Sequence, residues 1–166
     1  MIIIFESKTG FTKKYAEMLA SQTGFSLYST KELSKAPEGE DVIFLGWISA
    51  GKIQGLKKVI GKFVVKAVCA CGTGRKAEPD EDTFIKNNHI EGKPFFYLRG
   101  GCLPLSQMKG TDKIALSIFL KILKSKKDQS DEFMEAIGNV EKGCDYVSEE
   151  NITHVIEWVY GKRLSH

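Results

Sequence analysis

Short apolar runs recur along the chain and alternate with segments that have the periodicity of helices. The runs cover residues 2–6, 25–29, 41–46, 63–69 and 94–99. Between them, helical spacing is found over residues 13–22, 53–62 and 80–88. This alternation predicts an α/β fold in which helices cover both faces of a doubly wound, five-stranded parallel sheet. Because crossovers between parallel strands are right-handed, the loops after the first, third and fourth strands are expected at one edge of that sheet.

The first strand leads into a loop that is rich in hydroxyl groups. Ser7, Thr9 and Thr12 surround Gly10 at the point where a helix is expected to begin. The start of a helix carries unpaired N–H groups and the positive end of the helix dipole, so it attracts phosphate. Hydroxyl groups at this spacing are able to add hydrogen bonds to one phosphoryl group. The alternative is an ordinary strand–helix turn with Thr12 as the N-cap residue, and the spacing alone fits both.

This loop resembles the phosphate-binding loop of flavodoxins. Residues 7–12, Ser-Lys-Thr-Gly-Phe-Thr, match the pattern Thr/Ser-x-Thr-Gly-x-Thr at all four defining positions. Residues 50–52 (Ala-Gly-Lys) and residues 96–101, which precede an apolar helix, are similar to the flavodoxin-like subfamily that includes menaquinone-dependent protoporphyrinogen oxidases. The resemblance implies FMN as the cofactor. It also implies the strand order 2-1-3-4-5, in which ligands bind at the switch point between strands one and three.

The resemblance and the strand order together predict a flavin site made of three loops. The first loop is expected to hold the phosphate, and the second to lie along the flavin ring. The third is expected to offer backbone N–H groups and small residues to the edge of the ring. Trp47 is expected either to stack on the ring or to be a core residue after the third strand. The predicted cofactor-binding residues are Ser7, Lys8, Thr9, Gly10, Phe11, Thr12, Trp47, Ile48, Ser49, Ala50, Gly51, Lys52, Cys71, Gly72, Thr73 and Gly74.

The last third of the chain contains an unusually apolar helical segment. Over residues 113–127, apolar side chains occupy nearly the whole circumference of the predicted helix. A helix that lies on one face of a sheet needs an apolar stripe only a little over ~100° wide. A second cover is therefore expected, and it is provided by residues 131–142, by a second copy of the chain in a homodimer, or by a membrane surface. Residues 101–147 are expected to be a helical insertion within a single domain that spans residues 1–166.

Composition argues against several other classes of protein. The net charge is +3 and the basic residues are dispersed, so nucleic-acid binding is not expected. Cys69 and Cys71 lack the spacing of zinc knuckles, and no metal site is expected. No secretion signal or run of ~18 apolar residues is visible, so a cytoplasmic location with four reduced cysteines is expected. Peripheral contact with the inner face of the membrane is the alternative.

Three functions fit these features. The first is an FMN flavoprotein that carries electrons between protein partners, with no catalytic side chain because the flavin does the chemistry. The second is an oxidoreductase, similar to the protoporphyrinogen oxidases, that passes electrons to a quinone. The lysines around the apolar helix 113–127 fit its contact with anionic lipid. The third is an interaction module that binds no flavin, because Ser49 and Ala50 stand where flavodoxins often have an aromatic residue.

Overall fold

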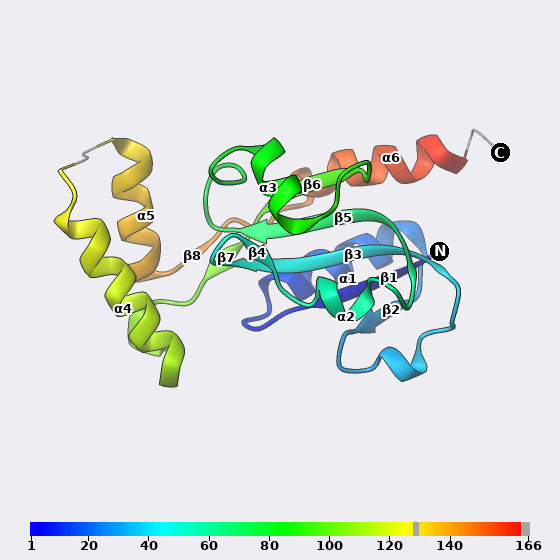
Figure 1. The fold of residues 1–166 in the computed structure, drawn as a ribbon, viewed down its shortest axis with the longest axis horizontal. Coiled ribbons are helices and arrows are strands. Elements are labelled where there is room, and N and C mark those ends of the chain that lie inside the picture. Colours follow the sequence, from blue (N-terminus) through cyan, green and yellow to red (C-terminus); the bar gives the residue numbers. More distant parts are fainter. Residues whose placement is uncertain (128–129, 164–166) are drawn as a thin grey trace.

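Five parallel strands form the centre of the molecule (Figure 1). The computed structural model describes residues 1–127 and 130–163, and residues 128–129 and 164–166 lie outside that description. The strands follow the order β2-β1-β3-β5-β6, with parallel neighbours throughout. They are β1 (Ile2–Glu6), β2 (Leu27–Ser29), β3 (Asp41–Ser49), β5 (Val64–Gly72) and β6 (Phe95–Arg99). Counted among the parallel strands, this is the predicted order 2-1-3-4-5, and the doubly wound α/β fold is confirmed.

The central strands β1 and β3 are buried on both faces. Ile3 and Ile4 in β1, like the run of residues 42–45 in β3, have no exposed surface. Branched and aromatic side chains suit such strands because both faces of a parallel sheet are covered by helices. The two strands pair from Ile2 with Val42 to Glu6 with Gly46. The loop after β1 therefore emerges at the same edge as the last part of β3.

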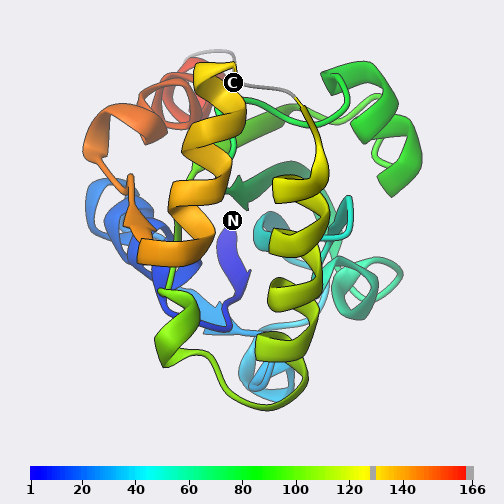
Figure 2. The same ribbon diagram turned by 90° about the vertical axis from the view of Figure 1, so that its left-hand side faces the viewer.

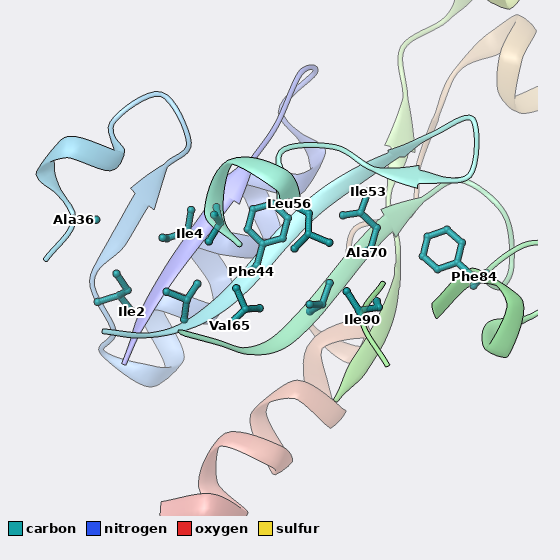
Figure 3. Close-up of a cluster of buried hydrophobic side chains, with 14 residues drawn as sticks. Ile2, Ile4, Ala36, Phe44, Ile53, Leu56, Val65, Ala70, Phe84 and Ile90 are labelled. Atoms are coloured by element: carbon teal, nitrogen blue, oxygen red, sulfur yellow. The ribbon is translucent and has the colours of Figure 1, made fainter. Parts of the chain in front are cut away.

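Helices cover the two faces of the sheet in separate apolar clusters. On one face, α1 (Phe11–Thr23) and α6 (Thr153–Arg163) pack through side chains that include Leu19 and Val155. On the other face, α2 (Leu56–Val59) and α3 (Glu81–Asn88) contribute Leu56 and Phe84. Figure 3 shows Leu56 beside Phe44, and Phe84 at the end of the cluster that contains Ala70. The short 3-10 turns are η1 (Leu33–Lys35), η2 (Leu105–Gln107) and η3 (Glu149–Ile152).

Several predicted boundaries near the carboxyl edge of the sheet are wrong. β3 and β5 each continue three residues beyond their predicted ends, to Ser49 and Gly72. Residues 47–49 were expected in a loop, but the end of β3 pairs antiparallel with β4 (Lys52–Ile53). The helix expected over residues 53–62 is reduced to the four residues of α2. Gly55, with φ 83°, takes a left-handed conformation immediately before α2, so the helix begins later than its apolar spacing suggests.

A helical hairpin follows β6 and caps the carboxyl edge of the sheet (Figures 1 and 2). β7 (Gly101–Cys102) pairs antiparallel with β8 (Cys144–Asp145), and we call residues 103–143 between them the insertion. Its helices are α4 (Gly110–Ser125) and α5 (Asp131–Lys142), which lie side by side (Figure 2). Leu123 and Val140 are buried, so α5 covers one side of α4. The opposite side of α4 stays open, and Ile114, Ile118 and Ile122 are 62%, 54% and 51% exposed.

Candidate functional site

A cavity of about 490 Å³ lies at the carboxyl edge of the sheet, within the range of ~300–1,000 Å³ that is usual for small-molecule sites. All three predicted segments contribute to its wall. The predicted residues that line it are Lys8, Thr9, Phe11, Thr12, Trp47, Ile48, Ser49, Ala50, Cys71, Gly72 and Thr73. The other predicted residues, which are not among the lining residues, are Ser7, Gly10, Gly51, Lys52 and Gly74.

The loop after β1 leaves the start of α1 open toward this cavity. α1 begins at Phe11, and the residue before it, Gly10, is left-handed with φ 97° and provides no side-chain cap. Ser7 supports the loop from behind, since its Oγ accepts a hydrogen bond of 3.1 Å from the Gly10 N–H. Thr12 lies inside the helix and is 2% exposed. The alternative in which Thr12 is the N-cap residue is therefore wrong.

The second segment forms a tight hairpin rather than an open loop. Its turn residues Ala50 and Gly51 both have positive φ, 48° and 73°, which matches the twist of a two-residue hairpin. Asn88 of α3 holds the hairpin, because its amide donates to the Gly51 carbonyl at 3.0 Å and its Oδ1 accepts from the Ile53 N–H at 2.9 Å. Lys52 donates to the carbonyl of Asn87. Gly51 and Lys52 thus contact α3, and the part of the hairpin before Gly51 faces the cavity.

The third segment continues β5 to the cavity. A Cβ atom added to Gly72 would lie 2.6 Å from the Tyr97 hydroxyl, so only glycine fits this position without a shift. The same hydroxyl donates to the Gly74 carbonyl at 2.9 Å, which fixes the loop after β5. Burial raises the pKa of the Cys71 thiol to about 12, and a hydrogen bond with Thr12 offsets part of that rise. The Cys71 side chain is therefore a neutral part of the wall at physiological pH.

The fourth wall comes from β7 and the insertion and was not predicted. The additional lining residues are Gly101, Cys102, Met108, Asp112, Ala115, Leu116 and Phe119. Most of them are small or apolar, so they close the cavity opposite the polar loop after β1. The one signal in the sequence was the excess of apolar residues around the helix 113–127. It indicated that a second surface was needed, but periodicity does not identify which surface a helix contacts.

One ion pair joins the loop after β1 to the insertion. The Lys8 Nζ lies 2.6 Å from the Asp112 carboxylate and 5.4 Å from the centre of the Trp47 ring. Both charged side chains are nearly half exposed, which limits such a pair to ~0–1 kcal/mol. The pair therefore holds Lys8 beside the cavity only weakly. A stronger anion is able to compete with Asp112 for the lysine.

A second cavity of about 480 Å³ adjoins the first, between residues 73–78 and the insertion. Thr73 and Phe119 line both cavities. Glu135 of α5 accepts two hydrogen bonds from Arg75, at 3.0 and 2.7 Å, and also pairs with Arg99. These contacts attach α5 to the loop after β5 and to the end of β6.

Comparison with known proteins adds no family assignment. A scan against protein-family models and a search of curated proteins each found no match. Over residues 1–127 and 130–163, no group of three or more His, Cys, Asp or Glu side chains is arranged to hold a metal ion. No helix in the described part of the chain is both long enough and apolar enough to cross a membrane.

Proposed function

We propose that the protein binds FMN in the cavity at the carboxyl edge of the sheet and carries electrons between redox partners. The observation that carries this proposal is the open start of α1, which adjoins the cavity with Thr9 and Thr12 in its wall. In an open α/β sheet, the crevice outside the carboxyl ends of the strands at the switch point is the usual ligand site. The resemblance of residues 7–12 to the flavodoxin loop makes FMN the ligand that fits best.

In this proposal each wall of the cavity contacts a different part of FMN. The N–H groups at the start of α1 and the hydroxyls of Thr9 and Thr12 bind the phosphate. Trp47 offers a flat aromatic surface to the ring, and Leu116 and Phe119 of α4 exclude water from it. The bound flavin supplies one- and two-electron transfer, so no side chain has to act as an acid, a base or a nucleophile.

The first experiment is an FMN titration of the purified protein, followed by flavin fluorescence and by the flavin absorbance near ~450 nm. Thr9→Val and Thr12→Val should each weaken binding by about 1–3 kcal/mol, or roughly 5- to 150-fold, because a phosphate oxygen loses its partner. Thr153→Val is the matched control, because Thr153 is exposed and does not line the cavity. Equal affinity in all three variants would show that the loop after β1 is not the phosphate site.

A second candidate function is a flavoenzyme that passes electrons from its substrate to a quinone at a membrane surface. The exposed row of Ile114, Ile118 and Ile122 on α4 favours it. Residues 109–127 contain six lysines and one aspartate, a net charge of +5 against +3 for the whole chain. An apolar row surrounded by positive charge suits an anionic lipid surface, whereas two copies of this face would repel each other.

Vesicle flotation separates the two functions. The quinone-dependent enzyme should float with vesicles that contain anionic lipid, and Ile118→Ser should reduce the bound fraction. It should also oxidise a porphyrinogen when a quinone is the acceptor. If the protein does not bind anionic vesicles and does not oxidise the porphyrinogen, electron transfer between redox partners is the function that remains. If the folded protein does not bind FMN, both functions are contradicted. The interpretation that remains is an interaction module of the same fold that binds no flavin.

A further inference from the structure

Two cysteines face each other at the base of the insertion. In the antiparallel pair of β7 and β8, Cys102 lies directly opposite Cys144. Directly opposed residues of such a pair have side chains on one face and Cα atoms ~4.5–5.5 Å apart, which falls within the range that a disulfide spans. Burial raises the pKa of the Cys144 thiol, the backbone of Cys102 lowers it and the Cys102 thiol raises it further, as is expected of two cysteines that lie close together. Both thiols are free in the structure.

The neighbouring glycines allow this close approach. A Cβ atom on Gly101 would lie 2.6 Å from the Cys144 carbonyl oxygen, and one on Gly143 would lie 2.9 Å from the Cys102 carbonyl oxygen. Gly143 also has a positive φ of 76°. The chain thus has a residue without a side chain beside each cysteine, at the points where the two strands come closest.

The pair is also accessible, unlike the other two cysteines. Cys102 and Cys144 are half-buried, and Cys102 lines the cavity at the carboxyl edge. Cys69 and Cys71 lie within β5, with 0% and 5% of their surface exposed. Cys69 and Cys71 are also two residues apart on one strand, which places their Cα atoms ~6.6 Å apart, at the long end of the range that a disulfide spans.

We propose that Cys102 and Cys144 form a reversible disulfide, a two-electron redox site at the base of the insertion. The oxidant is a small or protein disulfide. One cysteine thiolate attacks it to give a mixed disulfide and releases the first thiol. The second cysteine then attacks the sulfur of its partner and releases the second thiol. One S–S bond breaks and one forms, two electrons pass to the oxidant, and the two thiol protons end on the released thiols.

The test uses the unmodified protein in glutathione buffers of increasing oxidised fraction. Free thiols are then blocked with an alkylating reagent and the peptides are mapped by mass spectrometry. The expected product is one intramolecular bridge between Cys102 and Cys144, with Cys69 and Cys71 still alkylated, and dithiothreitol reverses it. The proposal is overturned if all four thiols remain free in oxidised glutathione alone, if the bridge joins two chains, or if glutathione remains attached to either cysteine.

Variants and pH provide two independent checks. Cys102→Ser should leave glutathione attached to Cys144, and Cys144→Ser should leave it attached to Cys102, because the second attack is blocked. Cys69→Ala is the control and should form the bridge normally. Burial raises the pKa of both Cys102 and Cys144, so bridging should be slow at neutral pH and accelerate with rising pH. A rate that does not change with pH would contradict thiolate attack.

Discussion

Glu6 shows how one carboxylate at the end of β1 is held in its charged form. Burial alone would raise its pKa, but hydrogen bonds from Lys58 and Thr30 and the charges of Lys58 and Lys31 lower the pKa below its usual value. The Lys58 Nζ lies 2.7 Å from the carboxylate, and the Glu6 side chain is 15% exposed. A carboxylate whose pKa is lower in the folded state stabilises the fold above its unfolded pKa, and the stabilisation is lost as the pH falls through the folded pKa.

We predict that Glu6→Gln lowers the free energy of unfolding at pH 7 by about 1–2 kcal/mol, because Lys58 and Thr30 lose their charged partner. The difference between the variant and the unmodified protein should shrink as the pH falls below the ordinary glutamate value of 4.5. Urea unfolding at several pH values measures it. Glu17→Gln, at an exposed position paired with Lys13, is the control and should change little at any pH.

Asp112 gives a second prediction for a single residue. If FMN phosphate binds beside Lys8, the carboxylate of Asp112 competes with it for the lysine and repels it. Asp112→Asn should therefore strengthen FMN binding about two- to fivefold at low salt, and less at high salt. Asp145→Asn is the control, because Asp145 pairs with Lys14 at 2.6 Å and does not line the cavity. Weaker binding by Asp112→Asn would indicate that the Lys8–Asp112 pair holds the cavity wall in place.

Among the elements, the β7–β8 pair depends on its packing against α1. A Cβ atom on Gly101 would lie 2.4 Å from the ring of Phe11, as well as close to the Cys144 carbonyl. We predict that Gly101→Ala destabilises the protein by about 1–3 kcal/mol, because a ring or a strand has to shift. Gly138→Ala is the matched control: this glycine lies in α5 with open space around it, and alanine there should stabilise the helix by about 0.5–1 kcal/mol. Thermal unfolding of both variants provides the comparison.

Elements made of continuous apolar runs were predictable, and those made by special backbone conformations were not. The runs over residues 2–6 and 41–46 follow from burial on both faces and are found as β1 and the first part of β3. The hairpin after β3 turns at Ala50 with a positive φ, a conformation that alanine rarely adopts and that its sequence does not signal.

The residues of the site could be predicted only where they lie close together in the sequence. Hydroxyl groups beside a helix start are visible as a pattern, and Thr9 and Thr12 do line the cavity. Phe119 and Leu116 reach the same cavity from more than a hundred residues away, through a helix whose apolar residues face several directions. Their contribution depends on the path of the insertion, which short-range spacing does not encode.

For the molecule as a whole, we infer that the insertion is separable from the core. In the described structure, neither apolar cluster of the sheet includes a residue of 103–143. The ends of the insertion meet at the paired residues Cys102 and Cys144. We predict that replacing residues 103–143 with an Asn-Gly turn leaves a protein that folds cooperatively, because two residues suffice to close an antiparallel pair.

The shortened protein should retain a single unfolding transition by circular dichroism and urea. It should bind FMN more weakly, since Leu116 and Phe119 are removed from the cavity wall, and it should lose any binding to anionic vesicles. A molten or aggregated product would contradict the separation of the insertion from the core.

The position of α6 has a consequence for protein synthesis. The parallel strands are complete by Arg99, but one face of the sheet receives Ile152, Val155 and Trp158 only from the last part of the chain. The ring of Trp158, for example, lies 6.2 Å from that of Phe96. A nascent chain therefore carries a finished row of strands in which α1 alone covers one apolar face while the whole insertion is being translated. Chains that stop within the insertion should be targets for chaperones and proteases.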